Sequence, residues 1–198
     1  DSAAVEDAEL RARVRLDPHL APGTSTESLD IHGHYLRYLL EHLGVTDERD
    51  VAAMERWRRE YNPPIGLWTR PDPRAAAALA RARGAGVVVG VISNSNGTVR
   101  HTLEAHGLAA PIDFIIDSSE VGVEKPDPRI FGLALARAGV AASEAAYVGD
   151  LYSVDVLGAR AAGLAAVLID PRGYWGARDC PRARDADHAV AILLGERN

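Results

Sequence analysis

Two carboxylates, Asp150 and Asp155, lie five residues apart, directly after the short apolar run Ala145–Val148. A segment of small residues, Gly158–Ala162, follows them and is expected to be helical. The carboxylates therefore stand on a loop that leaves a buried strand, which is where open parallel sheets bind ligands. Carboxylate oxygens on such a turn suit a hard cation such as Mg²⁺. The pattern alone is weak, because an aspartate at this position often only caps a helix.

A second polar cluster, Ser93–Gly97, follows the apolar run Val87–Ile92. Hydroxyls and free main-chain N–H groups between a strand and a helix form a natural seat for phosphate. The simpler interpretation is again helix capping, for which serine and asparagine are preferred.

The third candidate is Lys125, which is followed by Pro126 and lies just before an expected helix. A lysine held by nearby prolines could neutralise a phosphate or a carboxylate, or it could simply lie on the surface of a proline-rich turn. It is the only lysine among the 22 lysine and arginine residues. Because arginine supplies every other basic side chain of this pair of residue types, a lysine at this position is less easily explained by chance.

After Pro73, the strands and helices that must position these side chains are expected to alternate along the chain. Helices are expected at about 75–83, 98–106, 130–138 and 154–162, with strands at 87–92, 114–116, 145–148 and 165–169. This alternation predicts βαβ units and a parallel sheet. The continuous apolar run 87–92 is typical of a strand buried on both faces. The three polar sites then share one edge of the sheet.

The first third of the chain has a different character. Helices are expected at 3–16, 29–43 and 47–61, before the breaker pair Pro63-Pro64, so that about 15–70 is predicted to be a small all-helical unit. Tyr35, Tyr38 and Trp57 are expected in its core, and Trp68 at a hinge.

Composition excludes several classes of function. The chain has 198 residues, of which 47% are hydrophobic and 25% charged, and this is typical of a globular protein. The net charge of −6 and the lack of a basic run argue against nucleic-acid binding. No apolar run approaches the roughly 18 residues of a membrane span. The single Cys180 fits a reducing compartment, so a cytoplasmic location is expected.

Taken together, Ser93-Asn94, Lys125-Pro126 and Gly149-Asp150 with Asp155 match the second, third and fourth motifs of the haloacid dehalogenase superfamily of hydrolases. The resemblance covers about 72–170 closely. It implies an α/β fold with a Rossmann-like parallel sheet and helices on both faces. The unit at 15–70 resembles the helical cap of this superfamily, which assigns 1–14 and 71–198 to the core.

The resemblance also implies roles for these residues. Ser93 and the main-chain N–H of Asn94 would hold a phosphoryl oxygen, and Lys125 would offset negative charge. Asp150 would ligate Mg²⁺, and Asp155 would ligate it or brace the loop. The implied activity is that of a Mg²⁺-dependent phosphatase acting on a small phosphorylated metabolite through an aspartyl-phosphate.

One departure from the family is serious, because the first motif, which supplies the nucleophilic aspartate, is not found. The chain begins Asp1-Ser2 and resembles family members from just after that motif. The first strand would be the central one, between 87–92 and 145–148. Its loss would split the sheet and leave about 8–10 main-chain groups unpaired, at about 1–3 kcal/mol each. We therefore expect either an additional N-terminal segment or another occupant of the central position.

Three alternatives remain open. A 2-haloacid dehalogenase would share the fold, but it needs no metal and usually lacks the acidic fourth motif. A phosphomutase could share both the cap and the core. A catalytically inactive protein that binds a ligand or partner is favoured if Asp1 is the true N-terminus. The identity of the substrate and the oligomeric state are not indicated by the sequence.

Overall fold

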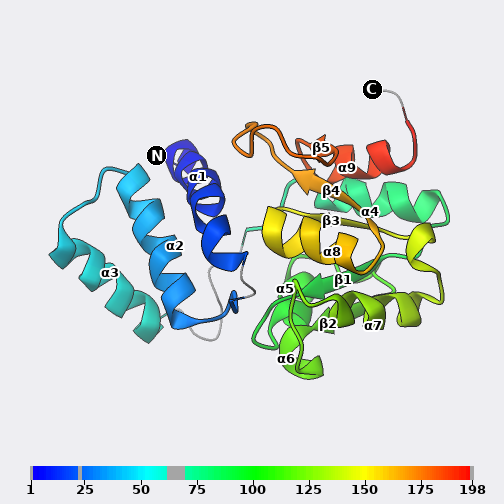
Figure 1. Cartoon of the computed structure of the whole chain (residues 1–198), viewed down its shortest axis with the longest axis horizontal. Helices are drawn as coiled ribbons and strands as arrows, with labels where there is room; N and C mark the ends of the chain where they lie inside the picture. The colour runs from blue at the N-terminus through cyan, green and yellow to red at the C-terminus, as the bar shows by residue number, and fades with distance from the viewer. Residues whose placement is uncertain (1, 22–23, 62–69, 197–198) are drawn as a thin grey trace. The chain divides into compact units, whose positions relative to one another are not determined.

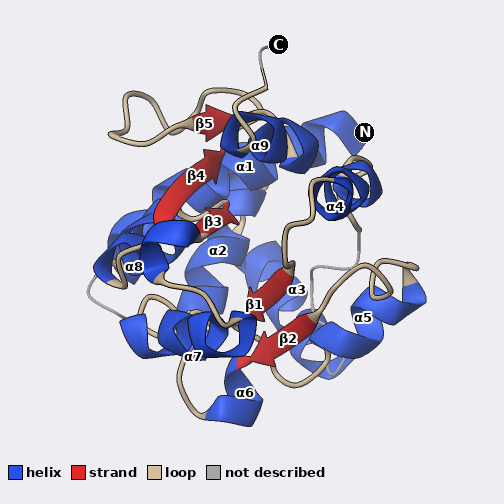
Figure 2. Cartoon of the chain, turned by 90° about the vertical axis from the view of Figure 1, so that its right-hand side faces the viewer, coloured by secondary structure: helices blue, strands red, loops and turns tan. Residues whose placement is uncertain are grey.

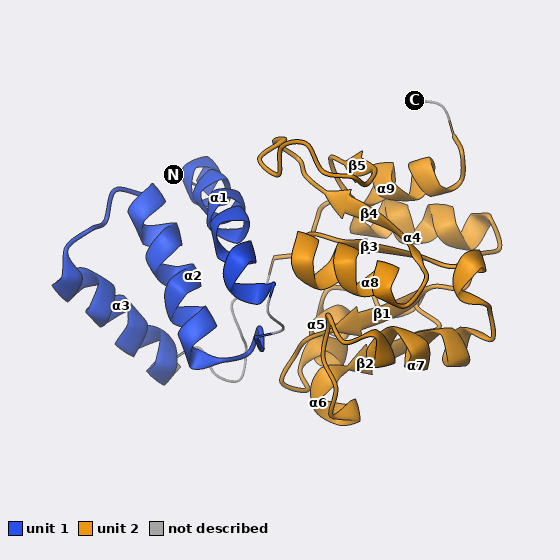
Figure 3. Ribbon diagram, in the orientation of Figure 1, with its two compact units in different colours: residues 1–69 blue, residues 70–198 orange. Residues whose placement is uncertain are grey.

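The computed structural model describes residues 2–21, 24–61 and 70–196, and the chain divides into two compact units. The first unit spans Asp1–Thr69 and the second Arg70–Asn198 (Figure 3). Pro63-Pro64 and Trp68, for which a break and a hinge were predicted, lie outside the described residues. Among the described helices, none combines the length and apolar character needed to cross a bilayer.

The first unit is helical, as its sequence predicts. Its helices are α1 (Ser2–Leu20), α2 (Leu29–His42) and α3 (Glu48–Tyr61) (Figure 1). Helix α1 buries residues at a spacing of four, which places them on one face: Ala8, Ala12, Leu16 and Leu20. Small residues on this face allow α1 to pack closely against α2. Leu36 and Leu40 of α2 form a separate cluster with Val51 of α3.

The structure differs from the expected division of the chain at 1–14. These residues belong to α1, which runs without interruption to Leu20 and packs within the first unit. The Tyr35 hydroxyl of α2 donates a hydrogen bond to Glu9 of α1 at 3.2 Å. Tyr35 and Tyr38 are buried, as predicted. The prediction for Trp57 was wrong, because 55% of its surface is exposed on α3.

The second unit alternates strands and helices. Its strands are β1 (Gly90–Ser93), β2 (Phe114–Asp117), β3 (Ala146–Gly149), β4 (Ala165–Ile169) and β5 (Arg182–Ala183). Its α-helices are α4 (Ala75–Gly84), α5 (Val99–Ala105), α6 (Ser118–Val121), α7 (Pro128–Ala138), α8 (Leu157–Ala161) and α9 (Ala186–Leu193). A 3₁₀ turn, Ala142–Glu144, precedes β3, and a π-helical turn, Tyr152–Val156, precedes α8.

All the described strand pairs are parallel, and helices cover both faces of the strands. Helices α7 and α8 pack together on one side, and α4 and α9 on the other (Figure 2). The core between these layers holds fully buried side chains from α7 and the strands: Ile116, Ile130, Phe131, Val167 and Leu168. The predicted α/β architecture is therefore confirmed. Strand β5 and helix α9 extend it beyond the elements that the sequence predicted.

The sheet is interrupted between β1 and β3. Strand β1 pairs with β2, and β3 pairs with β4, which pairs in turn with β5. Within the part of the chain that the structure describes, no strand pairs with β1 or β3 on the edges that face this gap. The interruption falls where the sequence places the central strand.

The strand predicted at 87–92 is shorter than expected. The paired strand begins only at Gly90, although the Val89 carbonyl already accepts from the Asp113 N–H at 2.8 Å, and Val87 and Val88 are 44% and 48% exposed. The prediction of a strand buried on both faces was therefore wrong for these two residues. Val87 and Val88 lie before the paired part of the strand, where the N–H of Val87 donates to the carbonyl of Ala82 in α4 at 3.1 Å.

Candidate functional site

The three predicted site positions are found at the carboxyl ends of strands or directly before a helix. Ser93 is the last residue of β1, and Asp150 directly follows β3. Lys125 lies in the loop before α7, whose start is fixed by Asp127. The Asp127 side chain caps the helix by accepting from the Arg129 N–H at 2.9 Å, and Pro128 occupies the first turn.

The Lys125 ammonium group is buried and held by two side chains of the second unit. Nζ donates to Oδ1 of Asp155 at 2.7 Å and to the Tyr147 hydroxyl at 3.0 Å. The exposed fraction of the Lys125 side chain is 12% and that of Asp155 is 2%. Burial alone would lower the pKa of Lys125, but the charge of Asp155 and the hydrogen bonds outweigh it and raise the pKa. Lys125 therefore remains positively charged at neutral pH.

Asp155 also organises the turn that carries Asp150. Its Oδ2 accepts hydrogen bonds from the main-chain N–H groups of Asp150 at 3.0 Å and Leu151 at 2.9 Å. The turn thus wraps around a buried carboxylate. Gly149 permits this close approach, since a Cβ atom there would lie 2.4 Å from Cβ of Asp155. The geometry matches the bracing role that was one of the two expectations for Asp155.

Asn94 joins the end of β1 to the lysine loop, a role that the sequence did not indicate. Its side-chain Nδ2 donates to the carbonyl oxygen of Lys125 at 2.9 Å, and the Lys125 N–H donates to its Oδ1 at 2.8 Å. One amide side chain therefore satisfies both main-chain polar groups of Lys125. The expected role of Asn94 concerned only its main-chain N–H, because nothing in the spacing shows which loop an amide side chain will meet.

Replacing Asn94 with alanine is expected to lower the free energy of unfolding by about 1–3 kcal/mol, because two part-buried main-chain groups lose their partner. Chemical denaturation measures this change. Ser143→Ala, on the 3₁₀ turn before β3, is a control that should have little effect. An Asn94→Ala variant as stable as the wild type would show that the pairing is not formed.

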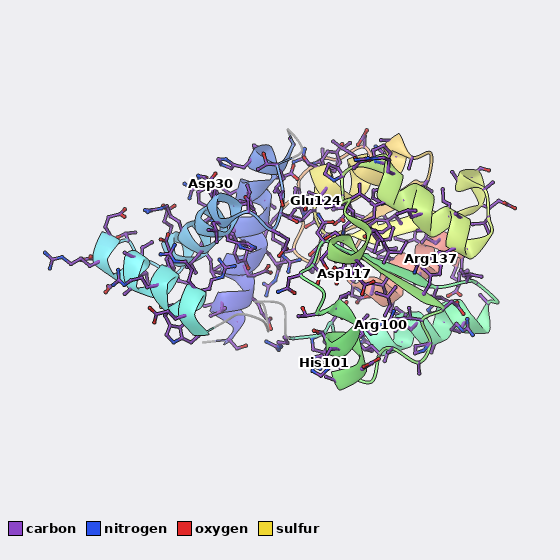
Figure 4. All side chains as sticks on the ribbon, turned by 90° about the horizontal axis from the view of Figure 1, so that it is seen from below. Asp30, Arg100, His101, Asp117, Glu124 and Arg137 are labelled. Carbon is purple, nitrogen blue, oxygen red and sulfur yellow. The ribbon has the colours of Figure 1, made fainter. Side chains whose placement is uncertain are left out.

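Asp117 is a second residue that the sequence did not indicate. It is the last residue of β2, in the second unit (Figure 4). It is opposite Ser93 in the register of β1 and β2 and is 1% exposed. Its carboxylate accepts from the main-chain N–H groups of Ser119 at 3.0 Å and Gly97 at 3.1 Å. Asp117 thus ties the loop after β1 to the loop after β2 and shapes the predicted phosphate seat.

The donor set at this edge agrees with a weakly held, hard cation. Both oxygens of Asp155 accept hydrogen bonds, and Asp150 is the half-buried carboxylate of the same turn. Among the described residues, no group of three or more His, Cys, Asp or Glu side chains could hold a metal ion. Mg²⁺ does not require such a cage, because it is commonly bound by one or two carboxylates, water and substrate phosphate. The carboxylate of Asp150 is of the chemical type that such a site uses.

The family model of the haloacid dehalogenase-like hydrolases matches residues 12–163, and the chain belongs to this family. A solved structure of a HAD phosphatase from Thermococcus onnurineus is 26% identical, with a TM-score of 0.59 over 96% of this chain and 94% of that one. The fold is thus that of the family.

Two curated relatives have the word phosphatase in their names. The phosphoserine phosphatase of Thermus thermophilus is 41% identical over 138 residues, which cover 68% of this chain and 52% of that protein. The ribulose-1,5-bisphosphate 5-phosphatase of Halopiger xanaduensis is 38% identical over 177 residues, 86% of this chain and 72% of that protein. The chain therefore spans about half the length of the first relative.

Proposed function

We propose that this protein is a Mg²⁺-dependent phosphatase that hydrolyses a small phosphomonoester through an aspartyl-phosphate. The observation that carries the proposal is the buried contact of Lys125 with Asp155, which in turn holds the Asp150 turn. This contact places the positive charge of Lys125 beside the turn that carries Asp150, at one edge of the sheet. The names of the two relatives support a phosphorylated metabolite as the substrate class.

Each residue of the site has a distinct part in this proposal. The Ser93 hydroxyl and the Asn94 main-chain N–H donate hydrogen bonds to phosphoryl oxygens. Lys125 supplies a fixed positive charge, because its raised pKa keeps the ammonium protonated. Asp150 holds Mg²⁺, and Asp155 positions both Asp150 and Lys125. Mg²⁺, when bound, contributes further positive charge near the phosphoryl oxygens.

The nucleophilic aspartate is not among the residues assigned to this site. The resemblance implies that it stands on a strand between β1 and β3, whose facing edges are unpaired in the described chain. The proposed activity requires a nucleophilic carboxylate at that position. The single Cys180 and the net charge of −6 support a cytoplasmic enzyme that acts on free metabolites.

The direct test is release of phosphate from p-nitrophenyl phosphate by the protein. We expect Mg²⁺-dependent hydrolysis that a chelator abolishes and that Asp150→Ala lowers by about a hundredfold or more. Asp30→Ala is the matched control, since that carboxylate is 82% exposed on α2 and should leave the rate unchanged. Metal-independent release of halide from 2-haloacids would instead show a dehalogenase. Lack of activity across a panel of phosphoesters would refute the proposal.

A further inference from the structure

The loop at 170–181, which joins β4 to β5 in the second unit, leaves the sheet beside the Asp150 turn. In the parallel register of β3 and β4, Gly149 lies opposite Leu168. The two strands therefore end next to each other, one in the Asp150 turn and the other in this loop. Open α/β sheets bind ligands outside the carboxyl ends of their strands. Side chains of this loop thus lie on the side of the sheet where a ligand held at the Asp150 turn can extend.

Arg178 of this loop lies over two aromatic rings. Its Cζ atom is 4.5 Å from the ring centroid of Tyr152 and 5.5 Å from that of Trp175. The two rings, whose centroids are 6.4 Å apart, form what we call the aromatic platform. Trp175 is buried, and Tyr152 is the second residue after Asp150. Because a guanidinium stacks on aromatic faces, the platform holds the Arg178 side chain beside the Asp150 turn.

The carboxylate nearest to Arg178 in the sequence is occupied by other groups. Oδ1 of Asp179 accepts a hydrogen bond from the Tyr152 hydroxyl at 2.7 Å, and Oδ2 pairs with Nη1 of Arg160 at 2.9 Å. Within the described residues, the Arg178 guanidinium forms neither an ion pair nor a hydrogen bond, and Arg178 is exposed. Its N–H donors are therefore available to a ligand.

We propose that Arg178 is a second anion-binding site, which recognises a carboxylate or phosphate group of the substrate other than the phosphoryl group that is removed. A guanidinium presents paired N–H donors that match two oxygens of either group. The substrate class is then a phosphomonoester that carries a second negative group. This substrate class rests on the proposed phosphatase function, whereas the binding of an anion by Arg178 does not.

Two other arginines near this loop provide matched controls. Arg182 donates to Oδ2 of Asp170 at 3.1 Å, and the side chain of Asp170 is only 2% exposed, so this guanidinium already has a carboxylate partner. Arg172 is exposed on the same loop as Arg178, and it stacks on no aromatic ring in the described part of the chain. Replacing Arg172 therefore removes the same charge from the loop without affecting the aromatic platform.

The first arm of the test measures anion binding in ¹⁵N-labelled protein, titrated with acetate and, separately, with inorganic phosphate. We expect the side-chain Nε–H signal of Arg178, assigned by its loss in Arg178→Lys, to shift until it saturates. The anion with the lower Kd identifies the group that Arg178 prefers. The Nε–H signal of Arg182 should stay in place. If neither anion shifts the Arg178 signal, or if Arg182 shifts equally, the proposal is wrong.

The second arm measures hydrolysis of alkyl phosphates whose far end carries a carboxylate or a phosphonate, over a range of chain lengths. Each is compared with the alkyl phosphate that lacks the second group. We expect the wild type to favour the best doubly charged substrate about tenfold or more in kcat/KM, because hydrogen bonds between charged groups are strong. Arg178→Ala should abolish this preference, and Arg172→Ala should retain it.

The two arms separate failure of this inference from failure of the proposed function. A wild type without the preference, or an Arg178→Ala variant that keeps it, would contradict the role of Arg178 in substrate choice. If the wild type hydrolyses none of the phosphate esters, the proposed phosphatase is refuted. The titration would still decide whether Arg178 binds anions.

Discussion

Replacing Asp155 with asparagine is expected to lower the free energy of unfolding of the second unit by about 3–5 kcal/mol, the usual cost of removing one partner from a buried ion pair. Asparagine has nearly the same shape, so the loss reflects charge and hydrogen bonding. The Lys125 ammonium would remain buried without a counter-charge. Oδ2 accepts hydrogen bonds from two main-chain N–H groups of the Asp150 turn. In asparagine one of the two carboxylate oxygens becomes an NH₂ group, so either these bonds or the bond to Lys125 would lose an acceptor. Urea denaturation followed by tryptophan fluorescence measures the change.

Glu48→Gln is the appropriate comparison for Asp155→Asn. It removes an ion pair with Arg37 in which Glu48 is 73% exposed, and a pair so well solvated should contribute little. The pKa of Lys125 is raised on folding, so the stabilisation is complete below the ordinary lysine pKa of about 10.4. It is lost only as the pH rises through the folded value, so the variant should be destabilised throughout the neutral range. A loss no greater than that of Glu48→Gln would contradict the buried pair.

Gly149→Ala should have the second largest effect. A Cβ atom at this position would lie 2.4 Å from Cβ and Cγ of Asp155 and 2.5 Å from its Oδ2. Asp155 is almost fully buried and has no room to move without losing Lys125 or the Asp150 turn. We expect a loss of about 1–3 kcal/mol in the free energy of unfolding, which is typical of overpacking. Thermal or urea denaturation measures it.

Gly132→Ala serves as the control for Gly149→Ala. Gly132 lies within α7, and a Cβ atom there meets nothing within 4 Å. Since alanine favours helix over glycine, this variant should be unchanged or more stable by about 0.5–1 kcal/mol. Equal stability of Gly149→Ala and wild type would show that Asp155 does not lie against the glycine.

Much of the fold could be predicted because local signals agree with the final structure. In α7, the expected helix is bounded by capping Asp127 and by Gly139, which adopts a positive φ of 70°. Exposure was harder to predict. Val87 and Val88 were predicted to be buried because an apolar run does not show where the paired part of a strand begins. Trp57 read as core because its size favours burial, although it faces outward from α3.

The candidate site was likewise only partly predictable from the sequence. Motif order predicted Ser93, Lys125 and Asp150 as site residues, since each follows a recognisable strand or precedes a helix. The contacts that hold them join residues distant in the chain. Asn94 reaches a loop 31 residues away, and Tyr147 reaches a carbonyl 55 residues away. Such pairs depend on how loops and strands pack in space, which neither spacing nor periodicity specifies.

The most direct test of the phosphate and Mg²⁺ site is a titration of the ¹⁵N-labelled chain with inorganic phosphate, with and without Mg²⁺. We expect phosphate to shift the main-chain N–H of Asn94 and the Nζ signal of Lys125, and Mg²⁺ to tighten the binding. Asp150→Asn should remove the effect of Mg²⁺ and retain the phosphate-induced shifts. If phosphate shifts neither signal, or Mg²⁺ tightens binding equally in Asp150→Asn, these residues do not form the proposed site.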